Sequence, residues 1–242
     1  MKIALLGYGK MGQVIERIAL ERGHEIVLKK SGKDTFDGLD QADVAIDFSI
    51  PDAAVGNISA CLNASIPVIS GTTGWLDQYD NVVGLCEDKK GAFIYGSNFS
   101  LGVNLFFELN EHLAKMMAKF DQYKVSMEEI HHTQKLDAPS GTAISLAKDI
   151  IENSDYSSWV LSDAKPDDTS ESELAKQILI DAKRIENVPG THTVTYNSKV
   201  DSIEIKHTAH NREGFALGAV IAAEWLVGKT GIFTMKDVLN LK

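Results

Sequence analysis

Short apolar runs alternate with segments of helical spacing through residues 1–99. Runs that stay apolar on both faces are typical of strands buried between layers of helices. They predict strands at residues 2–6, 25–28, 43–49, 67–70 and 92–95. Segments whose apolar positions recur with the period of a helix predict helices at about 11–22, 52–63 and 76–88. Strands that alternate with helices in this order predict an α/β domain built on a parallel sheet.

The pattern changes after residue 100, where amphipathic helices alternate with strands whose residues switch between apolar and polar. The predicted helices and strands here are 105–119, 124–130, 143–151, 191–197 and 202–207. The polar stretch 152–172 predicts an exposed loop, and the acidic residues in and beside it are Asp167, Asp168, Glu171 and Glu173. The small residues of a last predicted helix, 212–228, suit close packing on a sheet. This half is expected to form a smaller α+β domain with an open mixed sheet.

A glycine-rich turn follows the first predicted strand and opens the first predicted helix. It has the sequence Gly7-Tyr8-Gly9-Lys10-Met11-Gly12, the GxGxxG pattern of dinucleotide-binding folds. In that pattern the glycines permit a tight turn, the approach of a pyrophosphate to the backbone, and close packing of helix on strand. Similar turns also form for packing reasons alone. The flanking strands and helix favour a Rossmann-type dinucleotide site.

The end of the second predicted strand bears on the choice of cofactor. An acidic residue there binds the ribose 2′-hydroxyl of NAD, whereas a basic residue accommodates the 2′-phosphate of NADP. This chain has Lys29 and Lys30 at that point. We therefore expect NADPH to be preferred, or at least accepted as readily as NADH. Alternatively, both lysines are solvated loop residues, and Asp34 or Asp37 folds back toward the ribose.

A second glycine-containing loop, Gly71-Thr72-Thr73-Gly74, follows the fourth predicted strand. Ligands of doubly wound sheets bind at the carboxyl ends of the parallel strands, so the nicotinamide half of a cofactor would lie near this loop. The same residues could also form an ordinary turn between a strand and a helix.

The stretch 128–143 concentrates the candidates for chemistry on a substrate. Two adjacent histidines end a predicted strand, a lysine follows, and a turn at 137–139 leads into a helix that begins with Ser-Gly-Thr. Free amides and the positive end of the helix dipole would bind an anion there. Together these groups indicate a pocket for a carboxylated substrate that also needs a proton. The candidates are His131, His132, Lys135, Ser140, Gly141 and Thr142. The plainer alternatives are a polar strand end for the histidines and an N-cap for the serine.

Composition removes some classes of function. The formal net charge is −10 and no basic run offsets it, so we expect no nucleic-acid partner. No apolar stretch has the length of a membrane span, and a strand is predicted where a signal peptide would begin. Cys61 and Cys86 lack the spacing of metal ligands. They are expected to be reduced core thiols of a cytoplasmic protein, and we expect no metal site.

The run His-His-x-x-Lys-x-Asp-Ala-Pro-Ser-Gly-Thr-Ala at 131–143 resembles the signature of the dihydrodipicolinate reductase (4-hydroxy-tetrahydrodipicolinate reductase) family. The resemblance covers nearly the whole chain and includes Gly-Thr-Thr-Gly at 71–74 and Asn-Phe-Ser-x-Gly-Val-Asn at 98–104. It implies reduction of 4-hydroxy-tetrahydrodipicolinate, a cyclic dicarboxylate, by NADPH or NADH in lysine and diaminopimelate biosynthesis. It also implies a homotetramer assembled through the sheets of the second domain.

The resemblance further implies roles for individual residues. His131 matches the catalytic acid, His132 a substrate-binding neighbour, and Lys135 a lysine that assists protonation, while Gly141 and Thr142 match the loop that binds the substrate carboxylate next to Ser140. The expected cofactor contacts are Gly7, Tyr8, Gly9, Lys10, Met11, Gly12, Lys29, Lys30, Phe48, Gly71, Thr72, Thr73, Gly96, Ser97, Asn98 and Phe99. The last helix is expected to rejoin the nucleotide domain. That gives a Rossmann domain at 1–99 with 210–242 and a substrate domain at 100–209.

The chain departs from the family pattern in its short segment 31–42 and at Lys29, which replaces an acidic residue of members that take both cofactors. Two other functions share the nucleotide fold. A semialdehyde or amino-acid dehydrogenase is one, but the acylating kind needs a nucleophilic cysteine, and neither cysteine has a suitable context. A redox sensor that binds NAD(P) without turnover is the other, and it would not need the histidines and lysine.

Overall fold

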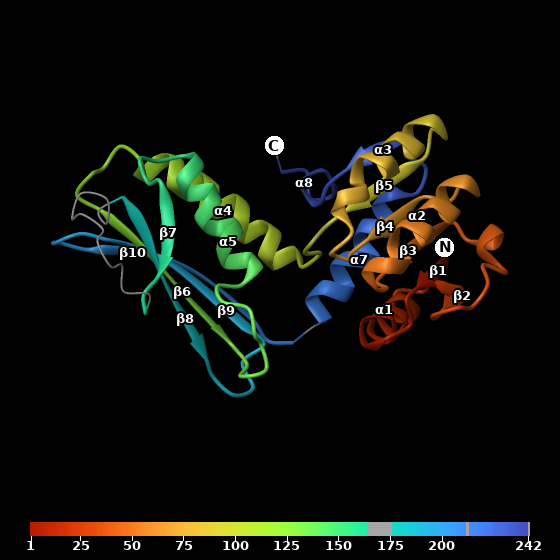
Figure 1. The fold of residues 1–242 in the computed structure, drawn as a ribbon, viewed down its shortest axis with the longest axis horizontal. Coiled ribbons are helices and arrows are strands. Elements are labelled where there is room, and N and C mark those ends of the chain that lie inside the picture. Colours follow the sequence, from red (N-terminus) through yellow and green to blue (C-terminus); the bar gives the residue numbers. More distant parts are fainter. Residues whose placement is uncertain (164–175, 212, 242) are drawn as a thin grey trace. The chain divides into compact units, whose positions relative to one another are not determined.

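The computed structural model of the chain describes residues 1–163, 176–211 and 213–241. It divides into two compact units, Met1–Asn104 with Glu213–Lys242, and Leu105–Arg212 (Figure 1). That these units act as separate nucleotide and substrate domains, with breaks at 99 and 210, stays a prediction. The four acidic residues expected in or beside the polar loop lie outside the described residues.

The first unit is built on a six-stranded sheet whose paired strands all run parallel. In spatial order the strands are β11 (Gly231–Phe233), β5 (Ala92–Tyr95), β4 (Val68–Ser70), β3 (Val44–Asp47), β1 (Lys2–Leu6) and β2 (Glu25–Lys30). The five strands predicted before residue 100 are all present, which confirms the α/β class. Strand β11 was not predicted, because three residues carry too little pattern to be recognised.

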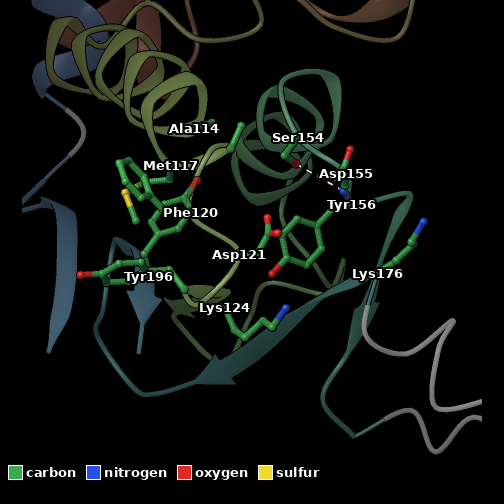
Figure 2. Close-up of a pocket in the computed structure, with 12 residues that line it drawn as sticks. Ala114, Met117, Phe120, Asp121, Lys124, Ser154, Asp155, Tyr156, Lys176 and Tyr196 are labelled. Carbon is green, nitrogen blue, oxygen red and sulfur yellow. Dashed lines mark hydrogen bonds between the residues drawn. The ribbon is translucent and has the colours of Figure 1, made fainter. Parts of the chain in front are cut away.

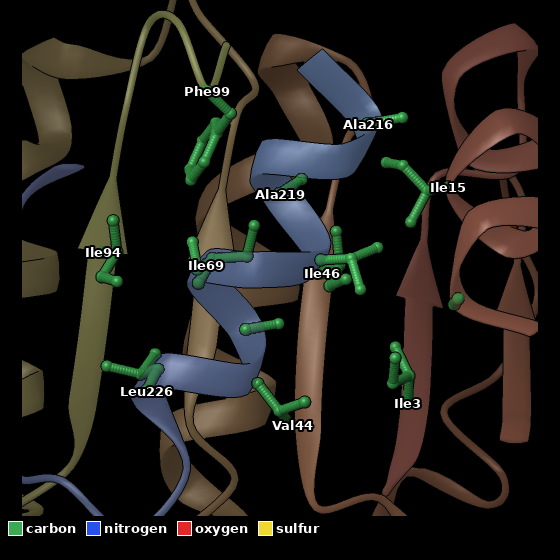
Figure 3. Packing of buried hydrophobic residues seen from close by; sticks show 14 of the residues in the cluster. Ile3, Ile15, Val44, Ile46, Ile69, Ile94, Phe99, Ala216, Ala219 and Leu226 are labelled. Carbon is green, nitrogen blue, oxygen red and sulfur yellow. The ribbon is translucent and has the colours of Figure 1, made fainter. Parts of the chain in front are cut away.

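Helices cover both faces of this sheet because its strands are apolar on both sides. Ile3 and Leu5 pack into the cluster with helices α1 (Lys10–Glu21) and α7 (Glu213–Leu226). Ala4 and Leu6 pack on the opposite side with α2 (Pro51–Asn63) and α3 (Tyr79–Asp88). Figure 3 shows α7 lying across β5, β4 and β3. The remaining short helices are η1 (Leu39–Gln41), η2 (Leu76–Gln78) and α8 (Met235–Val238).

Small residues bring α7 close to the rest of the unit, as its composition predicted. A Cβ atom on Gly218 would lie only 1.7 Å from the carbonyl oxygen of Phe99. Glycine is therefore required where this C-terminal helix meets a segment more than a hundred residues earlier. Cys61 and Cys86 are buried and unpaired in the core on the α2 and α3 side. No helix among the described residues combines the length and apolar character needed to span a membrane.

The second unit contains a five-stranded mixed sheet, which confirms the expected open mixed sheet. Its strands in spatial order are β10 (Ser202–Ala209), β9 (Gly190–Asn197), β6 (Lys124–His131), β8 (Gln177–Arg184) and β7 (Ser158–Leu161). β9 pairs antiparallel with both β10 and β6, whereas β8 pairs parallel with β6 and β7. Strands β7 and β8 were missed, and the loop predicted at 152–172 was wrong where it includes β7.

Helices α4 (Leu101–Met117) and α5 (Gly141–Glu152) pack on one face of this sheet. α4 begins four residues before the predicted 105, and Val103, three positions before Phe106, lies on the same side of the helix as that residue. Val125 and Met127 of β6 face these helices. Side chains alternate along a strand, so the next residues on the same face of β6 are Glu129 and His131. The sheet thus turns the first histidine and a carboxylate toward the helix-covered side.

Candidate active site

Glu129 is the centre of a buried polar cluster in the second unit. The register of the sheet places it opposite His192 of β9, and it places His131 opposite Arg184 of β8. Glu129 is fully buried, and its Oε2 atom lies 3.1 Å from His131 Nδ1 and 3.7 Å from His192 Nε2. The two imidazole rings meet edge to face, with centroids 5.0 Å apart. Of this group, only His131 was predicted.

Two further groups bind the Glu129 carboxylate. The backbone N–H of Ser140 donates to Oε2 at 3.1 Å, and Nη2 of Arg184 donates to Oε1 at 3.1 Å. Burial opposes ionisation, but the contacts from His131, Ser140 and Arg184 outweigh it and lower the pKa of Glu129 to about 2. Glu129 is therefore a carboxylate at neutral pH.

The two buried histidines differ in their surroundings. Burial, with the nearby positive charge of His131, lowers the pKa of His192 to about 4, so this imidazole is neutral at pH 7. Its Nε2 atom lies 2.9 Å from the hydroxyl of Ser140. His131 instead packs against a glycine. A Cβ atom on Gly190 would lie 3.1 Å from His131 Nε2, so a larger residue there would crowd the ring.

Glu129, His131 and His192 are also ligand types for a metal ion, and their ligand atoms all lie within 4.8 Å of one another. The carboxylate, however, already carries the guanidinium of Arg184 and the amide of Ser140. A second positive charge beside Arg184 would be repelled in this buried position. The contacts from Arg184 and Ser140 thus balance the carboxylate without a metal ion.

The predicted anion site lies at the start of α5. Ser140 is the N-cap, and its hydroxyl accepts a hydrogen bond from the backbone N–H of Ala143 at 3.2 Å. The first intrahelical backbone bond is donated by Ile144, so the amides of Gly141 and Thr142 precede the bonded turns. A Cβ atom on Gly141 would meet nothing within 4 Å. The N-cap interpretation thus holds for Ser140, while Gly141 is exposed and Thr142 is half-buried beside it.

Lys135 and His132 have neighbours outside the buried cluster around Glu129. Lys135 Nζ donates to the Asp137 carboxylate at 2.8 and 3.0 Å. Arg184 holds this loop, since it donates to the backbone oxygens of both Lys135 and Asp137. His132 borders a cavity of about 480 Å³, lined also by Thr133, Gln134, Glu186, Asn187, Val188, Pro189, His210 and Asn211. The adjacent histidines therefore occupy separate environments.

Another cavity in this unit, of about 430 Å³, lies at the opposite end of β6 (Figure 2). Phe120, Tyr156 and Tyr196 contribute much of its lining. Lys124, which also lines it, begins β6, whereas His131 ends that strand. Seven residues of extended chain separate the two ends by roughly 23 Å. None of the residues predicted for chemistry lines this cavity.

The glycine turn of the first unit has the geometry that a pyrophosphate needs. Gly7 has a φ of +101°, and a Cβ atom there would lie 2.1 Å from the Phe48 carbonyl oxygen. A Cβ atom on Gly12 would lie 2.3 Å from the Gly7 oxygen, so the helix packs directly on the turn. Gly9 is the N-cap of α1 and would meet nothing within 4 Å. These residues fit a dinucleotide phosphate, with open space above Gly9 and the helix end behind it.

A buried carboxylate holds the second cofactor loop. Asp47 is fully buried at the end of β3. Its oxygens accept hydrogen bonds at 2.7–2.9 Å from Ser49, Asn57, Ser70 and Thr72. The hydroxyl of Thr72 is thus turned inward and also accepts from the backbone N–H of Ser49. Asp47 has no distinctive sequence context, so it was not predicted.

The other residues predicted to contact the cofactor differ in how far their side chains are exposed. The ring of Phe48 covers Gly71, where a Cβ atom would lie 2.3 Å from the ring. Phe99 is 1% exposed, and its ring packs 5.8 Å from that of Phe48, so it offers a ligand only its backbone. Thr73 and Ser97 are exposed. The candidates with half-buried or exposed side chains, or with no side chain, are Tyr8, Lys10, Met11, Gly71, Gly96 and Asn98.

The two lysines of β2 are inside the strand, whose end was predicted too early at residue 28. Lys29 forms an ion pair with Glu16 of α1 at 2.5 Å. Lys30 is buried; its Nζ donates to the Gly32 carbonyl at 3.0 Å and lies over the ring of Phe36. Neither lysine is a freely solvated loop residue. Asp34 instead accepts a hydrogen bond from the backbone of Ser31.

The cysteines do not support an acylating dehydrogenase. Cys61 of α2 and Cys86 of α3 both point into the hydrophobic core on that side of the sheet. Burial raises the pKa of the Cys61 thiol, and burial with the nearby charge of Glu87 raises that of Cys86. A thiol in such a position is a poor nucleophile, because the thiolate is the reactive form.

Comparison with known proteins finds matches over nearly the whole chain. Residues 1–99 match the family model described as dihydrodipicolinate reductase, N-terminus, and residues 102–239 match dihydrodipicolinate reductase, C-terminus. A 4-hydroxy-tetrahydrodipicolinate reductase of Christiangramia forsetii is 58% identical over 99% of this chain and 98% of its own length. One from Archaeoglobus fulgidus is 35% identical over 99% of this chain and the full length of that protein.

Solved structures agree on the fold. A dipicolinate-bound dihydrodipicolinate reductase from Paenisporosarcina sp. TG-14 superimposes with a TM-score of 0.76 at 22% identity, covering 100% of this chain and 99% of that one. An amine dehydrogenase from Mycobacterium smegmatis reaches a TM-score of 0.61 at 9% identity, over 97% and 95% of the two chains. The two family models together cover nearly every residue, and the chain therefore belongs to the dihydrodipicolinate reductase (4-hydroxy-tetrahydrodipicolinate reductase) family.

Proposed function

We propose that this chain reduces 4-hydroxy-tetrahydrodipicolinate to tetrahydrodipicolinate in lysine and diaminopimelate biosynthesis, with His131 as the proton donor. As a member of its family, the chain is an NAD(P)H-dependent oxidoreductase. One observation carries the residue assignment. The buried Glu129 carboxylate joins the His131 ring and the backbone of Ser140, so the proton donor and the anion-binding helix end are held by one group.

Glu129 orients the His131 ring. Its Oε2 atom lies 3.1 Å from Nδ1, while Nε2 lies beside the backbone of Gly190. We assign Nε2 as the atom that gives its proton to the substrate ring carbon next to the reduced one. Imidazole is suited to this step because its unperturbed pKa lies near neutrality.

Lys135 supplies positive charge rather than the first proton. Its ammonium is bound to Asp137, and Arg184 fixes the backbone of this loop. A fixed ammonium near the reacting ring stabilises negative charge that develops during reduction. His192 stays neutral and orients the Ser140 hydroxyl, which places it outside the proton transfer itself.

The substrate carboxylate is assigned to the start of α5. The amides of Gly141 and Thr142, the Thr142 hydroxyl and the positive helix end are donors suited to it. His132, beside its own cavity, is assigned to the second carboxylate or the ring. These assignments keep the reacting ring within one unit's polar cluster.

The cofactor is assigned to the first unit. When bound, its reduced nicotinamide supplies the hydride. The turn from Gly7 to Gly12 would hold the pyrophosphate, and the backbone of Gly71 and Thr73 would border the nicotinamide, because the Thr72 hydroxyl is already bonded to Asp47. The Phe48 ring over Gly71 would limit the access of water to that edge of the sheet.

Assembly into a homotetramer is proposed for the open face of the second sheet. Among the described residues, α4 and α5 pack on the face that carries Ile178 and Ile180. The opposite face carries Leu179, which is 49% exposed. We expect light scattering at micromolar concentration to give about four chains per particle, and Leu179→Glu to reduce that number by placing charge in the interface. A wild-type monomer at that concentration would contradict the assignment.

Replacement of His131 tests the proton donor. We expect His131→Ala to lower kcat by roughly 10²–10⁴, the usual loss for a general acid, while KM changes much less. The assay follows NADPH oxidation with enzymatically generated substrate. His112→Ala, at an exposed position on α4, is the matched control. If His131→Ala stays within threefold of wild type, the histidine has no part in the chemical step.

Two substitutions at the start of α5 test the carboxylate site. Gly141→Val fills the open space above the backbone, and Thr142→Val keeps the shape but removes a hydroxyl donor. We expect KM to rise in both, by about tenfold or more for Gly141→Val and less for Thr142→Val, since each charged hydrogen bond contributes about 1.5–3 kcal/mol. Thr142→Ser retains the hydroxyl and serves as the control. An unchanged KM in both variants would place the anion site elsewhere.

The low pKa of His192 predicts acid sensitivity of the fold. The unfolded chain takes up this proton near pH 6.5, but the folded chain resists it until about pH 4. Stability is therefore present at neutral pH and is lost as the pH falls through that window, by up to about 3 kcal/mol. Urea unfolding at pH 7, 5 and 4 should show a smaller decline for His192→Gln than for wild type or His112→Gln. Equal declines would mean that His192 is protonated in the fold.

A further inference from the structure

Three side chains meet at the corner where the glycine turn, α1 and the end of β2 come together. Glu16 of α1 lies 2.5 Å from Lys29 Nζ, and the hydroxyl of Tyr8 donates to the same carboxylate. The Lys29 ammonium also sits over the Tyr8 ring, 5.0 Å from its centroid. The lysine expected to recognise a ribose phosphate is thus already bound by an acid that lies thirteen positions earlier.

We propose that Glu16 sets the cofactor preference by competing with the ribose 2′-phosphate of NADPH for the ammonium of Lys29. The inference rests on the cofactor site assigned above, and it deepens that assignment. Glu16 supplies the acidic group that β2 itself lacks at its end. Within this pair, Lys29 would bind the 2′-phosphate of NADPH, and Glu16 would accept a hydrogen bond from the 2′-hydroxyl of NADH.

The competition follows from charge. A 2′-phosphate brings close to two negative charges, which Lys29 attracts and Glu16 repels. NADPH binding must therefore break or share the existing ion pair. NADH brings a neutral 2′-hydroxyl, for which a carboxylate is the usual acceptor in dinucleotide-binding folds. Glu16 consequently weakens the binding of NADPH and leaves that of NADH unchanged or slightly stronger.

Glu16 is ionised in this arrangement. The hydrogen bonds from Lys29 and Tyr8 lower the pKa of its carboxyl group, in spite of partial burial. Its side chain is 17% exposed, compared with 43% for Lys29. The more exposed lysine can rotate toward a ligand, whereas the acid is held by the packing of α1.

Lys30 does not offer a second cation to the phosphate. It is 8% exposed, donates to the Gly32 carbonyl and lies over the Phe36 ring. Lys29 is therefore the more available of the two lysines in β2, and its partner Glu16 determines how readily it can turn to a ligand. The structure also offers a matched control, because Arg17 and Glu21 form an exposed pair elsewhere on α1.

The test measures cofactor binding directly, by calorimetry or by quenching of protein fluorescence, without substrate. We expect Glu16→Gln to lower the Kd for NADPH by about three- to tenfold at low salt, while the Kd for NADH stays level or rises. High salt should reduce the difference, because screening weakens exposed charge pairs. Lys29→Met should weaken NADPH binding, and in the Lys29→Met background Glu16→Gln should give a smaller gain, because only the direct repulsion between Glu16 and the phosphate is then removed. Glu21→Gln should leave both constants unchanged.

Each other result overturns a definite part of the proposal. If Glu16→Gln shifts both cofactors equally, or shifts neither, Glu16 has no role in selectivity even though the cofactor site stands. If the gain for NADPH is undiminished in the Lys29→Met background, the effect does not act through that lysine. If wild type binds neither cofactor, the proposed function itself fails, and circular dichroism of each variant excludes unfolding as the cause.

Discussion

The buried charge of Glu129 is the constraint on which the second unit depends. A carboxylate with no exposure to water is costly unless several donors compensate it. The groups that contact it come from two strands and one helix end, namely His131 of β6, Arg184 of β8 and the backbone of Ser140, while His192 of β9 lies 3.7 Å away. The contacts that balance this one charge therefore fix the register of the sheet, the start of α5 and the orientation of the His131 ring together.

The first unit also uses a buried carboxyl group to hold its loops in place. Asp47 sits at the end of a central strand, and its four side-chain partners hold the loops after β3 and β4. Burial raises the pKa of Asp47, against the effect of those hydrogen bonds. In each unit one loop residue, Thr72 or Ser140, donates a hydrogen bond to the buried carboxylate. The neighbouring residues are then free for a ligand, because their loop is held from below.

Local patterns predicted most elements of the first unit, the glycine turn and the stretch around His131, since each is written in consecutive residues. They could not predict Glu129 as the centre of the site. Its partners Arg184 and His192 lie more than fifty residues away, and only the pairing of β6 with β8 and β9 brings them together. The same limit applies to Glu16, which meets Lys29 through the packing of α1 against β2. Strand β7 was missed because its four residues lie within a polar stretch.

Local charge also explains how an acidic protein can bind anionic ligands. The chain has a formal net charge of −10, yet the second unit gathers Arg184, Lys135, two adjacent histidines and a helix N-terminus near one strand end. At physiological ionic strength charges are screened beyond about 8 Å, so distant acidic residues contribute little there. Glu129 pairs with Arg184 and Asp137 pairs with Lys135, so these carboxylates reduce the positive charge that a ligand meets there. The positive charge available to a carboxylate or phosphate ligand therefore depends on which cations are already paired and on how exposed those pairs are.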